Sequence, residues 1–385
     1  MNYTLRDPNG NVLLAVESSP VVTEADMTAD LDKAAKACES AFDEVTKYQD
    51  AVAVMSSEGF GEQAKAVAEK VKNKLIEWFK KIIDFFKRIG LFIGSIINKT
   101  IGKIFVRPAK LTEPEKQFLL EYKPSESVSG ESATMSVEGI DDNAHSHLRE
   151  QTALAAGDKD KRNYMNDPSV NTVRDAKLTA AGNILYDELR KILADSANKD
   201  PNDPKSAKYG FYACYISGNM RYITDYYEQL QKALIKSKEC TEMLNNLDIA
   251  SGNAELEGFY PPVPPKISNT IGRCNLQLTN GNLVNFYLNC DTFKSKLDDW
   301  IHPMANEVLK ELKDNNNCFE TILKSVENSN EIPNNYKNMC AEVINPIVEI
   351  NKQCLEFYSA YSYAVVSSNK FISRLNAALK GSVVN

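Results

Sequence analysis

Apolar residues recur at helical spacing over most of this chain, and residues 71–97 carry the widest apolar face. Apolar positions in this stretch alternate in steps of four and three, and neighbouring positions widen the stripe to more than half of the helix circumference. Lysine and arginine occupy the opposite side. The apolar face consists of Val71, Leu75, Trp78, Phe79, Ile82, Phe85, Phe86, Ile89, Phe92, Ile93 and Ile96. The basic side consists of Lys80, Lys81, Lys87 and Arg88.

So wide an apolar face needs a cover, and the sequence leaves two alternatives. In the first, the face packs against other helices of a bundle or against another copy of the chain, as the four-three spacing favours. In the second, the face enters a lipid interface while the basic side lies among anionic headgroups. The width of the face and the local charge of +7 over residues 65–103 favour lipid or a partner protein. Both alternatives hold together if the helix is sheltered until it is released.

The same periodicity predicts a mainly α fold, made of helical bundles with long amphipathic helices. The final helix has a heptad-like seam that suits the spine of a bundle. A minor β-hairpin is expected near 274–290, because Asn280-Gly281 is a strong turn signal between alternating segments. Further helices are expected at about 24–55, 145–156, 174–195, 207–247, 291–313, 316–328 and 334–379.

Composition divides the chain into four parts. Residues 1–22 form an extended leader with a turn signal at Asp-Pro-Asn-Gly, and we interpret this leader as a candidate propeptide. Residues 23–107 form an N-terminal helical region that contains the basic amphipathic helix. Residues 108–144 are rich in serine and glutamate and are expected to be a flexible linker. Residues 145–385 form a C-terminal α-helical domain into which the hairpin is inserted.

Charge and cysteine usage narrow the functional classes. The net charge of −7 disfavours general nucleic-acid binding, and residues 1–62, at −8, are acidic enough to pair with the basic helix. The N-terminus lacks the pattern of a secretory signal, and the longest uncharged stretch is about half of a bilayer span. The eight cysteines form no C-x-x-C pair. They are expected to be reduced, mostly buried thiols, with disulfides as the alternative in oxidising surroundings.

Motifs for catalysis and phosphate binding are missing, so we expect neither enzymatic activity nor a cofactor. His145 and His147 have too few companions for a metal site, and no metal is expected. The segment Pro261–Pro265 is interpreted as a rigid spacer between domains, with a ligand for an aromatic groove as the less favoured alternative.

Three tripeptides, each a small residue, any residue and a glutamate, are followed by another small residue and lie in segments expected to be extended or flexible. They end at Glu17, Glu131 and Glu138. This pattern resembles the maturation sites of head proteins in giant, phiKZ-like tailed bacteriophages, where a head protease removes propeptides. The stretch that ends in LLAVE then resembles a propeptide. The α-rich body with a lysine-rich amphipathic helix resembles internal head proteins.

The resemblance implies a non-enzymatic structural protein of the virion, located in the head interior or in the host cytoplasm, that is processed and ejected. Its implied partners are other virion proteins or copies of itself, with an anionic membrane surface as a further partner and no specific nucleic acid. Two alternatives stay open. One is a cytosolic helical scaffold that oligomerises through the amphipathic helix. The other, less favoured, is a toxin-like effector that acts on membranes.

Overall fold

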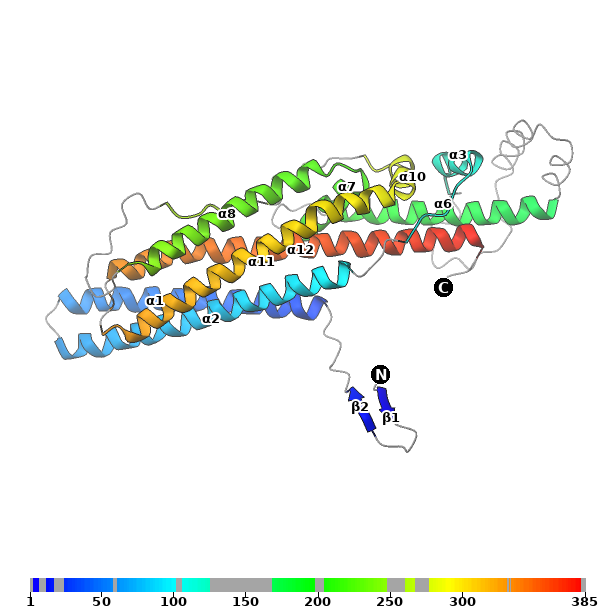
Figure 1. The fold of residues 1–385 in the computed structure, drawn as a ribbon. Coiled ribbons are helices and arrows are strands. Elements are labelled where there is room, and N and C mark those ends of the chain that lie inside the picture. Colours follow the sequence, from blue (N-terminus) through cyan, green and yellow to red (C-terminus); the bar gives the residue numbers. More distant parts are fainter. Residues whose placement is uncertain are drawn as a thin grey trace. The chain divides into compact units, whose positions relative to one another are not determined.

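The computed structural model describes residues 3–6, 12–16, 24–57, 61–101, 106–124, 168–197, 204–247, 260–266, 277–330, 332 and 334–381. Over these residues the protein is mainly α-helical, with one small antiparallel sheet (Figure 1). The expected α class and the expected helical bundle are therefore confirmed.

The helices follow the apolar repeats of the sequence closely. Helices α11 and α12 each contain one internal proline. The sequence suggested two helices over 291–328, but the structure has the single helix α11 there. The bounds are α1 Glu24–Ser57, α2 Gly61–Ile101, α3 Glu113–Glu121, α6 Pro168–Ala197, α7 Pro204–Ile216, α8 Arg221–Asn245, α10 Asn280–Leu288, α11 Cys290–Asn328 and α12 Asn334–Lys380.

The leader contains the only strands among the described residues. Strand β1 (Tyr3–Arg6) pairs antiparallel with β2 (Val12–Val16), and Tyr3 lies opposite Val16. The register shifts between Leu5 and Arg6. The extended conformation expected for the leader is thus found in its described residues.

The β-hairpin expected near 274–290 is wrong, because Asn280 and Gly281 begin helix α10 instead of forming a turn. Thr279 is the N-cap residue, and its hydroxyl accepts a hydrogen bond from the backbone N–H of Asn282 at 3.4 Å. The apolar residues after the cap suit a helix as well as a strand, and burial of one helical face decided between the two. That face consists of Leu283, Val284, Phe286 and Tyr287.

A single helix over 207–247 is also wrong, because the chain turns between α7 and α8. Gly218 has a φ of +70°, a left-handed conformation that favours glycine. A Cβ atom on Gly218 would lie 2.8 Å from the ring of Phe293, so the packing at the turn also requires glycine. The aromatic periodicity continues across the turn, and for this reason the sequence suggested one helix.

Residues 108–124 of the expected linker contain a short helix and are fixed to the rest of the second unit. We call residues 106–124 the strap. The strap contains α3, and the backbone N–H of Thr112 donates to the Glu115 carboxylate at 2.7 Å as part of a capping box. Its end is fixed by Tyr122, whose hydroxyl donates to Asn183 Oδ1 of α6 at 2.8 Å. The polar composition of the remaining linker obscured these capping signals.

The chain forms two compact units, each assembled from separated stretches of sequence. The first contains Met1–Phe92, Leu234–Val263 and Leu309–Lys352, and the second contains Ile93–Ala233, Pro264–Val308 and Gln353–Asn385. This division differs from the sequential domains 23–107 and 145–385. Four of the five boundaries fall inside α2, α8, α11 and α12, where a helical repeat has no change of composition to mark them, and the fifth falls between Val263 and Pro264.

Candidate functional site: a covered amphipathic helix

The apolar face of α2 is buried within the chain. All eleven of its residues are buried, and the most exposed of them, Ile96, retains only 3% of its surface. Nine belong to the first unit, and Ile93 and Ile96 belong to the second. On the other side of the helix, Leu91 is 76% exposed. The one-sided burial matches the predicted amphipathic helix.

In the first unit, α11 provides aromatic cover for this face. The ring of Phe319 lies 6.2 Å from that of Phe79 and 5.5 Å from that of Phe86, measured between ring centroids. Phe319 itself is fully buried. Aromatic pairs at these separations contribute about 0.5–1.5 kcal/mol beyond the burial of their area. The contact with α11 could not be predicted from the sequence, because the apolar repeat of α2 does not specify which helix packs against it.

The basic side is neutralised by carboxylates. Two of its lysines reach α11: Lys80 lies 3.0 Å from Glu327 and Lys87 lies 2.8 Å from Glu320. The other two residues pair within α2, where Lys81 lies 3.1 Å from Glu77 and Arg88 lies 2.8 Å from Asp84. Each predicted cation therefore has a carboxylate partner in the folded chain.

The expected pairing between the acidic N-terminal residues and the basic helix also occurs. Lys74 of α2 donates a hydrogen bond to Glu44 of α1 at 2.8 Å. This hydrogen bond and the positive charge hold the pKa of the Glu44 carboxyl below its usual value. The Lys87 ammonium lowers the pKa of Glu320 in the same way. These carboxylates stay ionised at neutral pH and support the packing of α2 against α1 and α11.

A lysine of α2 also caps the C-terminal end of α11. Lys72 Nζ donates to the backbone carbonyl oxygens of Glu327, at 3.0 Å, and of Ser329. Carbonyl groups at a helix C-terminus lack intrahelical partners and carry partial negative charge, so a lysine there is stabilising. Together with Lys80 and Lys87, this residue forms an edge along which α2 and α11 run antiparallel.

Burial outweighs charge in holding α2. Complete burial of one large apolar side chain contributes about 1.5–3 kcal/mol, so the eleven residues contribute about 15–30 kcal/mol as an upper figure. A partly exposed ion pair contributes about 0–1 kcal/mol. Transfer of α2 to a lipid surface would cover its own face again. The complementary surface of α11 would then be left bare, so such a transfer requires the first unit to open.

The described part of the chain carries neither a membrane-spanning helix nor a cluster of metal ligands. None of its helices is long and apolar enough to cross a bilayer. No group of three or more histidine, cysteine, aspartate or glutamate side chains there is arranged to hold a metal ion. His145 and His147 lie outside the described residues.

None of the described cysteines forms a disulfide, in agreement with the reduced, mostly buried thiols that the sequence predicted. Six are buried and Cys318 is half-buried, whereas Cys274 lies outside the described residues. Burial raises the pKa of Cys38 to about 11 and that of Cys290 to about 11, so both stay protonated at neutral pH. The buried cysteines are Cys38, Cys214, Cys240, Cys290, Cys340 and Cys354.

The three candidate cleavage residues lie outside the described residues, but their positions relative to the helices are clear. Glu17 directly follows β2, and Glu131 and Glu138 lie between α3 and α6. The same tripeptide occurs elsewhere, a point that the sequence prediction missed. Copies inside helices end at Glu39 in α1, Glu239 in α8, and Glu307 and Glu327 in α11. A further copy ending at Glu58 directly follows α1, and one ending at Glu331 lies between α11 and α12.

A polar network that the sequence prediction did not identify fixes the strap in the second unit. The backbone N–H of Ala109 donates to Tyr287 Oη at 2.7 Å and to Asn376 Oδ1 at 2.8 Å. Asn376 Nδ2 donates to the carbonyl oxygen of Arg107 at 2.8 Å. These residues come from the strap, α10 and α12. The strap lies more than 170 positions from Tyr287 and Asn376, so no local signal marked the network.

Comparisons of the chain with protein-family models, with curated proteins and with solved structures found no match.

Proposed function

We propose that this protein is a non-enzymatic structural protein of a bacteriophage virion, an internal head protein of the phiKZ-like kind that is trimmed by a head protease. In this proposal α2 is a packing helix that stabilises the folded body. It is not a membrane anchor in the folded protein. Other virion proteins, or copies of the chain, are the expected partners.

The observation that carries the proposal is the complete cover of the apolar face by the chain itself. A toxin-like effector that acts through α2 must first uncover this face, against about 15–30 kcal/mol of burial. A scaffold that oligomerises through this face must do the same. A self-contained bundle with paired charges suits a protein that is packed among others without inserting into a bilayer.

The placement of the tripeptides supports processing as part of the proposal. Proteases bind their substrates as extended chain, and a helical backbone is already hydrogen bonded. Cleavage after Glu17, Glu131 or Glu138 would leave every described helix intact. The copies inside α1, α8 and α11 are protected by their helices in the folded protein. The fold thus separates the copies inside helices from those that end at Glu17, Glu131 and Glu138. The copies that end at Glu58 and Glu331 also lie outside the helices.

Mass spectrometry of purified phage particles tests this proposal. We expect a mature N-terminus at Ser18 and a chain break after Glu131 or Glu138, with no cleavage after Glu39, Glu239 or Glu327. Glu17→Ala should abolish the first cut, whereas Glu39→Ala, a matched change inside α1, should leave it unchanged. Absence of the protein from particles would overturn the proposal and favour a cytosolic scaffold. Cuts inside the helices would remove the structural argument for processing.

Vesicle flotation tests the role of α2. The full-length chain is mixed with vesicles that contain phosphatidylglycerol, and we expect it to stay at the bottom of the gradient. Flotation of the folded chain that is lost in Leu91→Asp, on the exposed side of α2, would contradict a purely packing role. Flotation that appears only after acid or denaturant opens the bundle would agree with it, because only then is the apolar face uncovered.

A further inference from the structure

The segment Tyr260–Lys266, sequence YPPVPPK, exposes its side chains with a period of three. Tyr260 is 72% exposed, Val263 is 80% exposed and Lys266 is exposed. Of the four prolines, Pro262 is buried, Pro261 is exposed, and Pro264 and Pro265 are both half-buried. With Leu91, Tyr260 and Val263 are the most exposed large apolar side chains among the described residues. Two such residues within four positions are an unusual surface feature.

A period of three is the repeat of the polyproline II helix. Its three residues per turn place every third side chain on the same edge, and the four prolines fix φ near the required value. The outward edge therefore carries Tyr260, Val263 and Lys266. The edge toward the body carries Pro262 and Pro265. Regular α-helical or strand spacing would not produce this alternation of exposed and buried positions.

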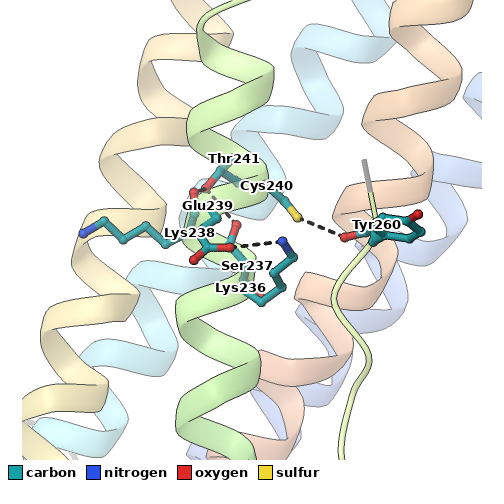
Figure 2. Close-up of polar contacts among 7 residues, drawn as sticks. All are labelled: Lys236, Ser237, Lys238, Glu239, Cys240, Thr241 and Tyr260. Atoms are coloured by element: carbon teal, nitrogen blue, oxygen red, sulfur yellow. Dashed lines mark hydrogen bonds and ion pairs between the residues drawn. The ribbon is translucent and has the colours of Figure 1, made fainter. Parts of the chain in front are cut away.

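The fold anchors this segment through its backbone and leaves its outward edge free. The thiol of Cys240 in α8 donates a weak hydrogen bond to the carbonyl oxygen of Tyr260 at 3.5 Å, while the ring of Tyr260 points away from Cys240 (Figure 2). Burial raises the pKa of Cys240, so the thiol keeps the proton that it donates.

The polar side chains around Cys240 are already engaged with other groups. Lys236 Nζ lies 3.0 Å from Glu239, and Thr241 Oγ1 donates to the Ser237 carbonyl at 3.0 Å (Figure 2). Lys238 pairs with Asp314 of α11 at 3.3 Å. The charged side chains beside the segment are therefore neutralised. A partner protein would recognise the exposed side chains of residues 260–266 instead.

We propose that residues 260–266 are a docking ligand for a partner protein whose binding groove is lined with aromatic side chains. Such grooves accept polyproline II segments as pairs of a residue and a following proline, and the low conformational entropy of the free segment favours binding. Tyr260-Pro261 and Val263-Pro264 provide two such pairs, in which Tyr260, Pro261 and Val263 are exposed and Pro264 is half-buried. Lys266, one turn further on, is placed to meet a carboxylate of the partner.

A rigid spacer explains less of what is observed. The prolines alone give a spacer its stiffness, and a spacer gains nothing from a tyrosine and a valine held in water. The two prolines that face the body are those that a groove does not need. The division of edges thus suits recognition by an aromatic groove.

Binding of a defined probe tests the proposal. The full-length chain is titrated with an isolated SH3 domain that accepts P-x-x-P-x-K ligands, and nuclear magnetic resonance maps the perturbed residues. We expect saturable binding at residues 260–266. Val263→Asp and Tyr260→Ser should each weaken it by about tenfold or more, because each removes one occupied slot. Lys266→Glu should weaken it by a smaller factor and reduce its dependence on salt.

The matched control is Ile235→Asp, which places the same acidic group at a partly exposed apolar position of α8. It should leave binding unchanged. Val263→Asp should keep the thermal unfolding midpoint of the parent, because the side chain is exposed, and this shows that a loss of binding is not a loss of fold. Absence of binding by the parent chain at about millimolar probe, or equal binding by Val263→Asp, would overturn the proposal.

Discussion

Helices α2 and α12 are both long and both buried, but they are buried in different ways. Helix α2 buries one face, which is purely apolar, and turns charged side chains to solvent. Helix α12 between residues 353 and 372 is buried on nearly all sides. Its buried set includes small and polar side chains, namely Gln353, Ser359, Ser362, Ser367, Ser368 and Asn376.

The difference shows two ways to stabilise a long helix. In α2 the buried apolar area provides most of the stability, and the ion pairs lie at the edge of the buried face. In α12 small side chains let neighbouring helices approach, and aromatic rings fill the remaining space. Phe357 lies at the centre of this packing, with ring centroids 5.5 Å from Phe211, 5.8 Å from Tyr226 and 5.9 Å from Tyr227. Substitutions in the two helices should therefore lower the free energy of unfolding for different reasons.

The largest expected effect is a cavity under the apolar face of α2. Phe79→Ala should lower the free energy of unfolding by about 3–5 kcal/mol, because it removes a fully buried ring and leaves a void. Leu91→Ala, on the exposed side of α2, should change it by no more than about 0.5 kcal/mol. Denaturant unfolding of the two variants measures the contrast. Equal effects would mean that the face is not the stabilising element.

In α12 the expected cause of destabilisation is overpacking. Ser368 is fully buried, and Ser368→Leu should lower the free energy of unfolding by about 1–3 kcal/mol because the surrounding helices must move apart. Val366→Leu, at a position that is 42% exposed, is the matched control and should be nearly neutral. The same denaturant experiment applies. A stabilised Ser368→Leu would show that this part of the core holds unfilled space.

A smaller effect is expected where the strap meets the second unit. Tyr287→Phe removes the hydroxyl bonded to Ala109 and Asn376 and should lower the free energy of unfolding by about 1 kcal/mol. Burial raises the pKa of Tyr287 to about 12. The stabilisation that follows from this shift is complete below about pH 10 and is lost as the pH rises toward 12. Tyr287→Phe should flatten this alkaline loss, and an unchanged alkaline profile would contradict the assignment.

The smallest effect is expected at the charged rim of α2. The Lys87–Glu320 pair holds the pKa of Glu320 below its usual value, so its contribution is present above about pH 4.3 and is lost as the pH falls below that. Both side chains are partly exposed, and Glu320→Gln should change the free energy of unfolding by about 1 kcal/mol or less at neutral pH. Unfolding curves at pH 7 and at about pH 3 should differ less in this variant than in the parent. A larger loss of stability at neutral pH would mean that the ion pairs contribute more to the free energy of unfolding than burial does.

The apolar repeat alone determined that the chain is helical, where the long helices lie, and which side of α2 is buried. These properties are local, because a period near 3.6 places one set of side chains on one face wherever the helix packs. The free, buried thiols also followed from the sequence. The strand pairing of the leader agreed with its turn signal.

Only the tertiary structure decided what covers each face. Phe319 and Glu320 are more than 200 positions from the residues of α2 that they contact. No spacing of residues in the sequence predicts this pairing of α2 with α11. The same limit explains the errors at α10, at Gly218 and in the strap. In these places a turn signal, an aromatic repeat or a polar composition competed with long-range packing, and burial against distant helices determined the conformation.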